Sequence, residues 1–293
     1  MGTIDLSQLA APEVVESLSF ETLMGELLAD LQARDSAFTA LVESDPAYKV
    51  LEVVAYRELL TRQRVNDAAR QVMLAYAAGT DLEHLAALHG LERLLLDAGD
   101  PTAVPPVPPT YETDARLRER VQLAPEGRST AGPVDGYVFH ALSASASVAD
   151  VDVTSPAAGE VVVTVLAVDG VPDAELLALV DASVNDRSVR PLTDQVTVQA
   201  ATLVDYAVEA TVHVYAGPDP AVVLAGAEAA AAAYCAAHAK LGHDIPLSGL
   251  YGALHQPGVQ RVVLTAPVAD VVIASHEASN LTGLTVSLGT VDE

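Results

Sequence analysis

The sequence predicts a multidomain α+β protein in which a helical N-terminal region is followed by two small α+β modules and a short β tail. Residues 47–78 contain neither glycine nor proline and are rich in helix formers, whereas residues 98–110 contain five prolines. Beyond the prolines, alternating β-branched segments separate shorter helical segments, which is typical of α+β modules. We therefore divide the chain into a helical region at 1–97, a proline-rich linker at 98–113, modules at 114–201 and 202–267, and a β tail at 268–293.

One helix of the N-terminal region is expected to be unusually long. Asp45 supplies an N-cap side chain and Pro46 suits the first helical position, so a helix is predicted over residues 47–78. At 1.5 Å per residue it would be roughly 45 Å long. Gly79 is expected to end it. Thr80 and Glu83 then have the spacing of a capping box, which predicts a second, short helix.

The proline-rich run at 98–110 is incompatible with a helix and is predicted to form a stiff, extended spacer. We expect this spacer to let the helical and α+β halves of the chain change their relative orientation.

The two modules are predicted from changes in hydrophobic period. In the first, we expect helices at 114–123, 134–145 and 173–184 and strands at 148–154, 160–168 and 195–200. In the second, we expect strands at 203–215 and 259–265 and helices at 220–240 and 248–255. The similar size of the modules suggests a divergent internal repeat, although no residue-level periodicity supports it. The tail is predicted to contain short strands near 271–274 and 285–288.

Charge and composition exclude several classes of partner. The chain has 40 acidic and 15 basic residues, a formal net charge of −25, which repels phosphate backbones and anionic membrane surfaces. We therefore expect neither nucleic acid nor membrane as a partner. Aromatic residues make up 4% and tryptophan is absent, so the cores must be built from Ala, Val and Leu. We expect part of the apolar surface to be shared between subunits.

The single cysteine suits a reducing cytoplasm, and the most apolar segment does not predict a membrane span. Cys235 cannot form an internal disulfide, and its alanine-rich surroundings predict a buried thiol. The segment 222–239 contains Glu228 and His238 and is interpreted as a soluble helix, not a membrane span. The first ten residues show no targeting signal.

No combination of residues predicts catalysis, a cofactor or a metal site. Ser129 lies between glycines at the wrong spacing for a nucleophile elbow, so we expect a structural loop there. His238, His243 and Asp244 fit no zinc spacing, and His84 and His89 are not four residues apart. Chance pairs among so many carboxylates do not identify a glycosidase site.

Basic residues gather on the long helix, which makes it a candidate docking surface for an acidic partner helix. Arg57, Arg64 and Arg70 have no acidic residue four positions N-terminal, whereas Glu58 and Arg62 have the spacing of an ion pair. The alternative is a solvated face with local ion pairs. The helix is also apolar on more than one face, so it must be covered on more than one side. The candidate partner-binding residues are Arg57, Arg62, Arg64, Arg70, Val54 and Leu59.

Several longer runs of residues, distributed along the whole chain, are specific enough to indicate a family. In the N-terminal part they include Ile4-Asp5-Leu6-Ser7-Gln8-Leu9 and Leu51-Glu52-Val53-Val54-Ala55-Tyr56-Arg57-Glu58-Leu59-Leu60. Later runs are Asp114-Ala115-Arg116-Leu117-Arg118, Val151-Asp152-Val153-Thr154-Ser155-Pro156, Val189-Arg190-Pro191-Leu192-Thr193-Asp194 and Gly258-Val259-Gln260-Arg261-Val262. These runs closely resemble the baseplate assembly protein J family of contractile-tailed phages.

The resemblance implies a structural, non-enzymatic wedge subunit that surrounds the central spike of a tail baseplate and couples baseplate rearrangement to sheath contraction. The implied partners are other copies of the chain, the baseplate wedge protein I, a wedge subunit with a lysozyme-like fold, the central spike or hub, and sheath or tube proteins. The implied location is the virion tail baseplate, assembled in the host bacterial cytoplasm. Two alternatives remain open: a tail-associated cell-wall hydrolase, and a subunit of a tail-like bacteriocin or other injection apparatus.

Overall fold

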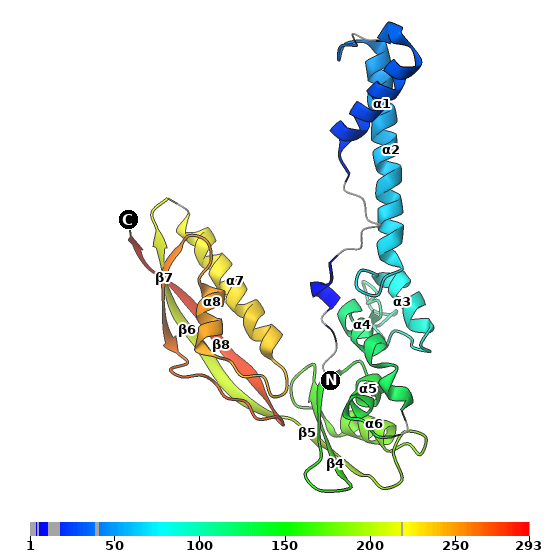
Figure 1. The fold of residues 1–293 in the computed structure, drawn as a ribbon. Coiled ribbons are helices and arrows are strands. Elements are labelled where there is room, and N and C mark those ends of the chain that lie inside the picture. The colour runs from blue at the N-terminus through cyan, green and yellow to red at the C-terminus, as the bar shows by residue number, and fades with distance from the viewer. Residues whose placement is uncertain are drawn as a thin grey trace. The chain divides into compact units, whose positions relative to one another are not determined.

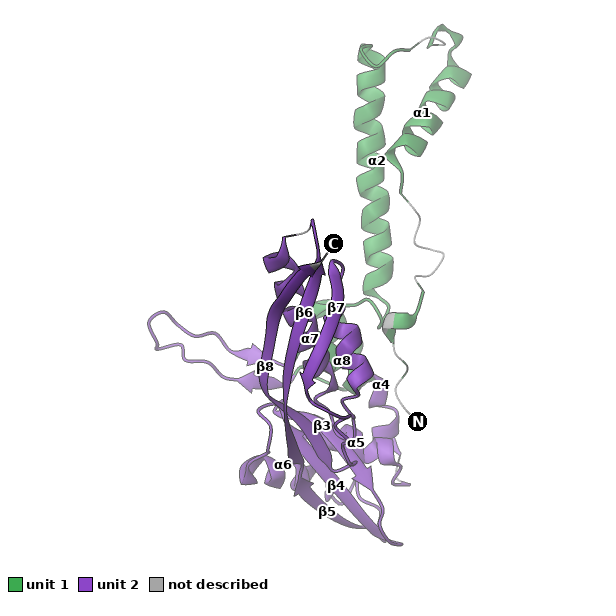
Figure 2. Cartoon of the chain, turned by 90° about the vertical axis from the view of Figure 1, so that its left-hand side faces the viewer, with its two compact units in different colours: residues 1–93, 113–121 green, residues 94–112, 122–293 purple. Residues whose placement is uncertain are grey.

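The computed structural model describes residues 4, 6–10, 18–38, 41–129, 131–217 and 219–292. The chain forms two compact units (Figure 2): unit 1 comprises residues 1–93 and 113–121, and unit 2 comprises residues 94–112 and 122–293. The chain therefore passes between the units three times, after residues 93, 112 and 121. Helices and strands are mixed, with a helical N-terminal region, as the sequence predicted.

Unit 1 is built on a pair of helices, α1 (Phe20–Arg34) and α2 (Pro46–Gln71), which lie side by side in Figure 1. Short 3-10 turns at Leu6–Gln8 and Ser36–Phe38 precede and follow α1. The Ser19 hydroxyl accepts a hydrogen bond from the Thr22 amide and caps α1. The two helices pack through Leu23 and Met24 of α1 and Ala55 of α2, which is fully buried. The small side chain at position 55 lets the helices approach closely.

The long helix is shorter than predicted, because tertiary hydrogen bonds interrupt it. Asp45 and Pro46 begin α2 as expected, but α2 ends at Gln71, not at residue 78. Beyond it, Arg118 donates hydrogen bonds to the carbonyls of Leu74 (2.8 Å) and Ala77 (2.6 Å), so these groups are bonded outside the helix. Sequence periodicity cannot show a donor that lies 41 or more residues away.

The predicted capping box is also wrong. Helix α3 (Gly79–Ala87) begins at the glycine that was expected to end the preceding helix, and its N-cap is Ala78, which offers no side-chain acceptor. The carboxylate of Asp114 replaces the cap and accepts a hydrogen bond from the Gly79 amide at 3.0 Å. Gly79 has a φ of +55°, a conformation that favours glycine.

The proline-rich segment is a hairpin arm, so the expectation of an extended spacer is wrong. Strands β1 (Leu95–Asp97) and β2 (Thr110–Tyr111) pair antiparallel, and Asp100 and Val107 exchange two backbone hydrogen bonds of 2.9 Å. The two ends of the segment therefore lie next to each other. The chain passes from unit 1 into unit 2 just before the segment and returns to unit 1 just after it. A hinge within residues 98–110 would move the arm and not the units.

The first module contains a three-stranded sheet covered by two helices. Strand β4 (Glu160–Ala167) lies between β3 (Val148–Thr154), which is antiparallel to it, and β5 (Gln195–Ala200), which is parallel. Helices α5 (Val134–Ala144) and α6 (Ala174–Val184) pack on one face around Val163, Val180 and Val184. Helix α4 (Asp114–Leu123) and a 3-10 turn (Glu126–Arg128) lead into this module.

The second module has a sheet of order β7-β6-β8 in which β6 (Thr202–Tyr215) is central. Helices α7 (Pro220–His238) and α8 (Leu247–Leu254) join β6 to the antiparallel β7 (Val259–Ala266). The inward-facing side chains of β6 alternate as predicted and are buried: Tyr206, Val208, Ala210, Val212 and Val214. In the first module the central strand of the sheet, β4, is the second strand in chain order. In the second module the central strand, β6, is the first strand in chain order. The two modules therefore differ in connectivity, which does not support a simple internal repeat.

The C-terminal segment forms one long strand where two short ones were expected. Strand β8 (Glu277–Asp292) has 16 residues and runs parallel to β6 along most of its length. Residue Val271 makes only an isolated bridge to Ile245. The strand was hard to recognise because Asn280, Thr282 and Gly283 interrupt its apolar alternation.

Among the residues that the structure describes, α7 is the one helix long and apolar enough to cross a membrane, with a mean hydropathy of 1.4. It packs on the sheet of the second module through Val223, Ala227, Ala231 and Cys235. Cys235 is buried, as predicted, and burial raises the pKa of its thiol.

Replacing Leu254 by alanine tests the core of the second module. Leu254 is fully buried, so the substitution should lower the free energy of unfolding by about 2–5 kcal/mol. Leu192→Ala is the matched control, because the Leu192 side chain is 99% exposed. Urea unfolding of both variants gives the comparison; equal effects would contradict the assignment of the core.

Candidate partner-binding surface

Helix α2 has one side that packs on α1 and one that does not. Tyr48, Leu51, Ala55 and Leu59 face the α1 cluster. On the remaining surface of α2, the side chains of Val50, Val53, Leu60 and Val65 are between 41% and 63% exposed. Leu59, which was predicted to bind a partner, therefore contributes to packing within unit 1. Val54, also predicted, is 44% exposed.

The four predicted arginines do not form one stripe. Arg57 and Arg64 are exposed and seven residues apart, so they lie on the same face, two turns from each other. Arg62 is partly buried and pairs with Glu58, with 2.7 Å between Nη2 and Oε1. Arg70 is partly buried near the end of α2. The structure thus brings together Arg57 and Arg64 and separates them from the other two.

A shallow groove opens where the start of α1 meets α2. Its lining residues are Phe20, Glu52, Val53, Tyr56 and Arg57. Lys49 and Glu52 form an ion pair of 3.0 Å, which neutralises the one acidic side chain of the groove. Arg57 has no ion pair within the described part of the chain, so its charge remains available to a partner. The groove therefore combines two aromatic rings with one positive charge.

A second group of charged residues was missed by the sequence analysis, because its members are far apart in the chain. Arg93 donates hydrogen bonds of 2.6 Å to both Glu83 and Asp114. Burial alone would lower the pKa of Arg93, but the hydrogen bonds to Glu83 and Asp114 raise it above its ordinary value. The Gly79 amide, followed by Arg93, holds the pKa of Asp114 below its usual range.

This group explains part of the family resemblance. Asp114 and Arg118 belong to the run Asp114-Ala115-Arg116-Leu117-Arg118, and both side chains bond to the backbone after α2. The run therefore fastens α4 to the end of the helical hairpin. Its role in unit 1 is structural.

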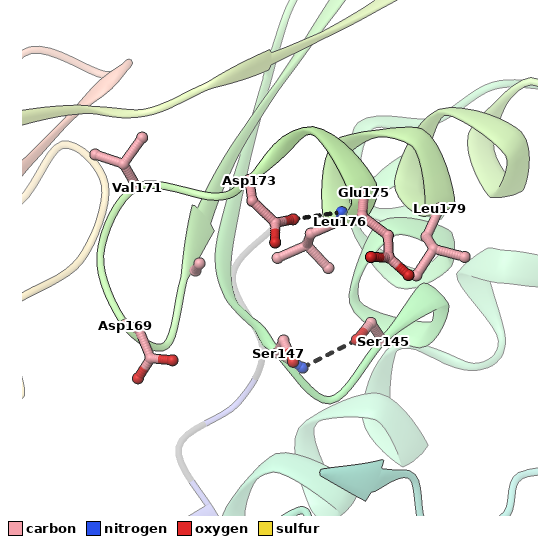
Figure 3. A pocket seen from close by; sticks show the side chains of 9 residues that line it. Ser145, Ser147, Asp169, Val171, Asp173, Glu175, Leu176 and Leu179 are labelled. Atoms are coloured by element: carbon pink, nitrogen blue, oxygen red, sulfur yellow. Dashed lines mark hydrogen bonds between the residues drawn. The ribbon is translucent and has the colours of Figure 1, made fainter. Parts of the chain in front are cut away.

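The pocket in Figure 3 is acidic but is not arranged as a hydrolytic site. It lies in the first module and is lined in part by Asp169, Asp173 and Glu175. Asp173 caps α6 by accepting a hydrogen bond of 2.8 Å from the Leu176 amide. Figure 3 shows Asp169 pointing away from Asp173 and Glu175. Asp173 therefore serves as a helix cap and Asp169 faces away from the other two carboxylates, so these observations give no support to a pair of the kind that glycoside hydrolysis uses.

The remaining candidates for chemistry have structural contacts. Ser129 accepts a hydrogen bond from the Ala131 amide, which fits the predicted loop. His238 contacts the Tyr234 carbonyl through Nδ1, and its ring centroid lies 6.3 Å from that of His243. The described ranges of the chain contain no group of three or more His, Cys, Asp or Glu side chains that could hold a metal ion.

A helix face with exposed apolar and basic side chains, in a chain that also contains two sheet modules, is typical of a class of protein, namely a structural subunit that assembles with other proteins. Three family models match the chain: the Baseplate J-like N-terminal domain at residues 43–100, the Baseplate J-like central domain at 129–200 and the Baseplate J-like protein C-terminal domain at 206–287. The chain is also 46% identical to Baseplate protein J of Escherichia phage P2 in an alignment of 302 positions that covers the full length of both proteins. The chain therefore belongs to the baseplate J family and is a structural baseplate protein. Nothing in these matches supports a cell-wall hydrolase.

The contribution of Asp114 to stability should depend on pH. Its folded-state pKa lies below the unfolded value of about 4, so the stabilisation is complete above that value and is lost as the pH falls through the folded-state pKa. Asp114→Asn should therefore lower the thermal unfolding midpoint at neutral pH, and its effect should shrink as the pH falls below the unfolded value towards the folded-state pKa. Asp30→Asn is the control, since the Asp30–Arg34 pair is largely exposed. A midpoint difference that does not change with pH would contradict this role.

Proposed function

We propose that the chain is a wedge subunit of a contractile tail baseplate and that the outward face of α2 binds a partner helix. The observation that carries this proposal is the exposure of Val50, Val53 and Leu60 on the same helix as Arg57 and Arg64, which form no ion pair with any residue that the structure describes. Family membership supports the general assignment, and the helix face supports the choice of surface.

The physical argument rests on burial. Each exposed valine or leucine of α2 gains stability when water is removed from it, at about 25 cal/mol per Å² of apolar surface. Helix α1 has 15 residues and α2 has 26, so α1 covers one side of α2 and only part of its length. Further helices from other chains would complete a bundle around α2.

Charge favours an acidic partner at this face. A carboxylate opposite Arg57 or Arg64 would increase the association rate and fix the register of the two helices. The partner that fits the proposal is the baseplate wedge protein I. Other copies of the chain, the wedge subunit with a lysozyme-like fold, the central spike or hub, and sheath or tube proteins would contact the remaining surfaces.

In this proposal the chain acts through assembly and not through catalysis. It is built in the host bacterial cytoplasm and functions in the virion tail baseplate. A ring of wedges held by many moderate interfaces can be shifted to an expanded state when contacts at its periphery change. Such a shift would couple baseplate rearrangement to sheath contraction.

Charge reversal on α2 tests the proposal. The chain is expressed together with the neighbouring tail proteins, and the mass of each complex is measured by light scattering. Arg57→Glu combined with Arg64→Glu should weaken the complex with the wedge partner at least about tenfold, which corresponds to 1.4 kcal/mol. Arg34→Glu is the matched control, because Arg34 lies on α1 in an exposed pair. A parent chain that remains a monomer in the presence of these partners would refute the wedge assignment.

A further inference from the structure

The proline-rich arm, defined as residues 95–111, is exposed along nearly its entire length. Figure 2 shows it as a hairpin that projects from unit 2. Its apolar side chains face solvent: Leu95, Leu96, Val104, Val107 and Tyr111 are all at least 44% exposed, and Val104 at the tip is 98% exposed. Such a group of exposed apolar residues on a projecting hairpin is typical of a segment that binds another protein.

The arm is preorganised for binding. Asp100 accepts hydrogen bonds from the amide and the hydroxyl of Thr102, at 2.8 and 2.6 Å, and exchanges two backbone bonds with Val107. At the neck, Gly99 packs so closely under the Val107 carbonyl that an added Cβ would collide with it. Because prolines and these bonds already restrict the arm, it loses little conformational entropy when it docks.

The chemistry of the arm identifies the kind of surface that it fits. Grooves lined by aromatic side chains bind proline-rich segments, and this hairpin arm carries Pro105, Pro106, Pro108 and Pro109 between its strands. Aromatic residues are only 4% of this chain, yet Phe20 and Tyr56 line the same groove on α1 and α2, together with Val53 and Arg57. The groove therefore offers the rings that a proline ridge requires.

Arm and groove are also complementary in charge. Asp97 and Asp100 are the charged residues of the arm, and both are exposed. The groove presents Arg57, whose charge no described side chain neutralises, and Arg64 lies two turns further along α2. A negative apolar arm and a positive aromatic groove thus occur on the same chain.

We propose that the arm of one copy docks into the Phe20–Tyr56 groove of a second copy. This inference rests on the proposed function, because it uses the outward face of α2 as an assembly surface. Since arm and groove are different surfaces, each copy donates one contact and receives another. Repeated head-to-tail contacts of this kind close into a ring when the rotation between copies allows it. In this arrangement the arm would occupy the part of the outward face of α2 at Val53 and Arg57, and the partner helix would bind further along α2 at Leu60 and Arg64.

Disulfide trapping between two single-cysteine variants tests the proposal. The chain has one cysteine, Cys235, which is buried, so an introduced thiol is the accessible one. Full-length Val104→Cys is mixed with full-length Val53→Cys under mild oxidation, and linked peptides are identified by mass spectrometry. We expect the 104–53 link to form at least about tenfold faster than the link between Val104→Cys and Val268→Cys, because docking raises the effective concentration. Val268 is an exposed control position in unit 2. If Val53→Cys does not fold, Glu52→Cys takes its place, because Glu52 lines the same groove and its replacement keeps Phe20, Tyr56 and Arg57.

Reversing the charges of Asp100 and Arg57 tests whether the disulfide between positions 104 and 53 forms because the arm docks in the groove. Asp100→Arg on the arm chain, or Arg57→Glu on the groove chain, should each slow the 104–53 link about tenfold, and combining the two should restore it. Equal rates for Val53→Cys and Val268→Cys overturn the proposal, as does a pair of reversed charges that fails to restore linking. A link found only when both cysteines are on one chain also overturns it, because the arm would then occupy its own groove.

The outcome can be separated from that of the proposed function. Asp100→Arg leaves α2 unchanged, so the complex with the wedge partner should keep its mass and stability in this variant. A retained complex without selective 104–53 linking refutes the arm contact alone. Loss of the complex in the parent chain refutes the wedge assignment.

Discussion

A 26-residue helix beside a 15-residue helix is the constraint on which unit 1 depends. Helix α1 covers one side of α2, and fully buried Ala55 sets the distance between them. The other side of α2 keeps its valines and leucines in solvent, where they contribute nothing to the stability of the isolated chain. The same side carries the exposed side chains of Arg57 and Arg64. The exposed apolar side chains of α2 and its incomplete packing therefore have the same cause, which is that α1 covers only one side of α2.

The cores of the two sheet modules are built mainly from small side chains. Each has a three-stranded sheet with helices on one face, and valine and alanine supply most of the buried positions. Cores of this kind pack well at short distance but bury little area per residue. A protein built in this way gains from sharing surfaces with neighbours, which agrees with membership of a family of baseplate subunits.

Local pattern predicted the elements whose partners are near in sequence. The bounds of α4, β3 and β5 agree with those read from the sequence, because period and turn residues are enough to place them. Prediction failed where distant groups decide the backbone. Arg118 ends the helical run after α2, pairing of β1 with β2 folds the prolines into an arm, and pairing with β6 extends β8. Composition placed the candidate surface on α2, and its role in partner binding remains a prediction. Within it, α1 covers Leu59, and Glu58 pairs with Arg62. The five-part division of the chain remains a prediction.

The three passages of the chain between its units have a consequence for how the protein is made. A ribosome releases α1 and α2 first, with their apolar side chains, yet Asp114 and Arg118, which complete the end of this hairpin, follow only after the whole arm has been synthesised. During that interval the nascent hairpin lacks its final hydrogen bonds while its outward face is already available. If partner helices bind this face as proposed, newly synthesised ones can reach it before the rest of the chain has folded, and the order of translation then becomes part of the order of assembly.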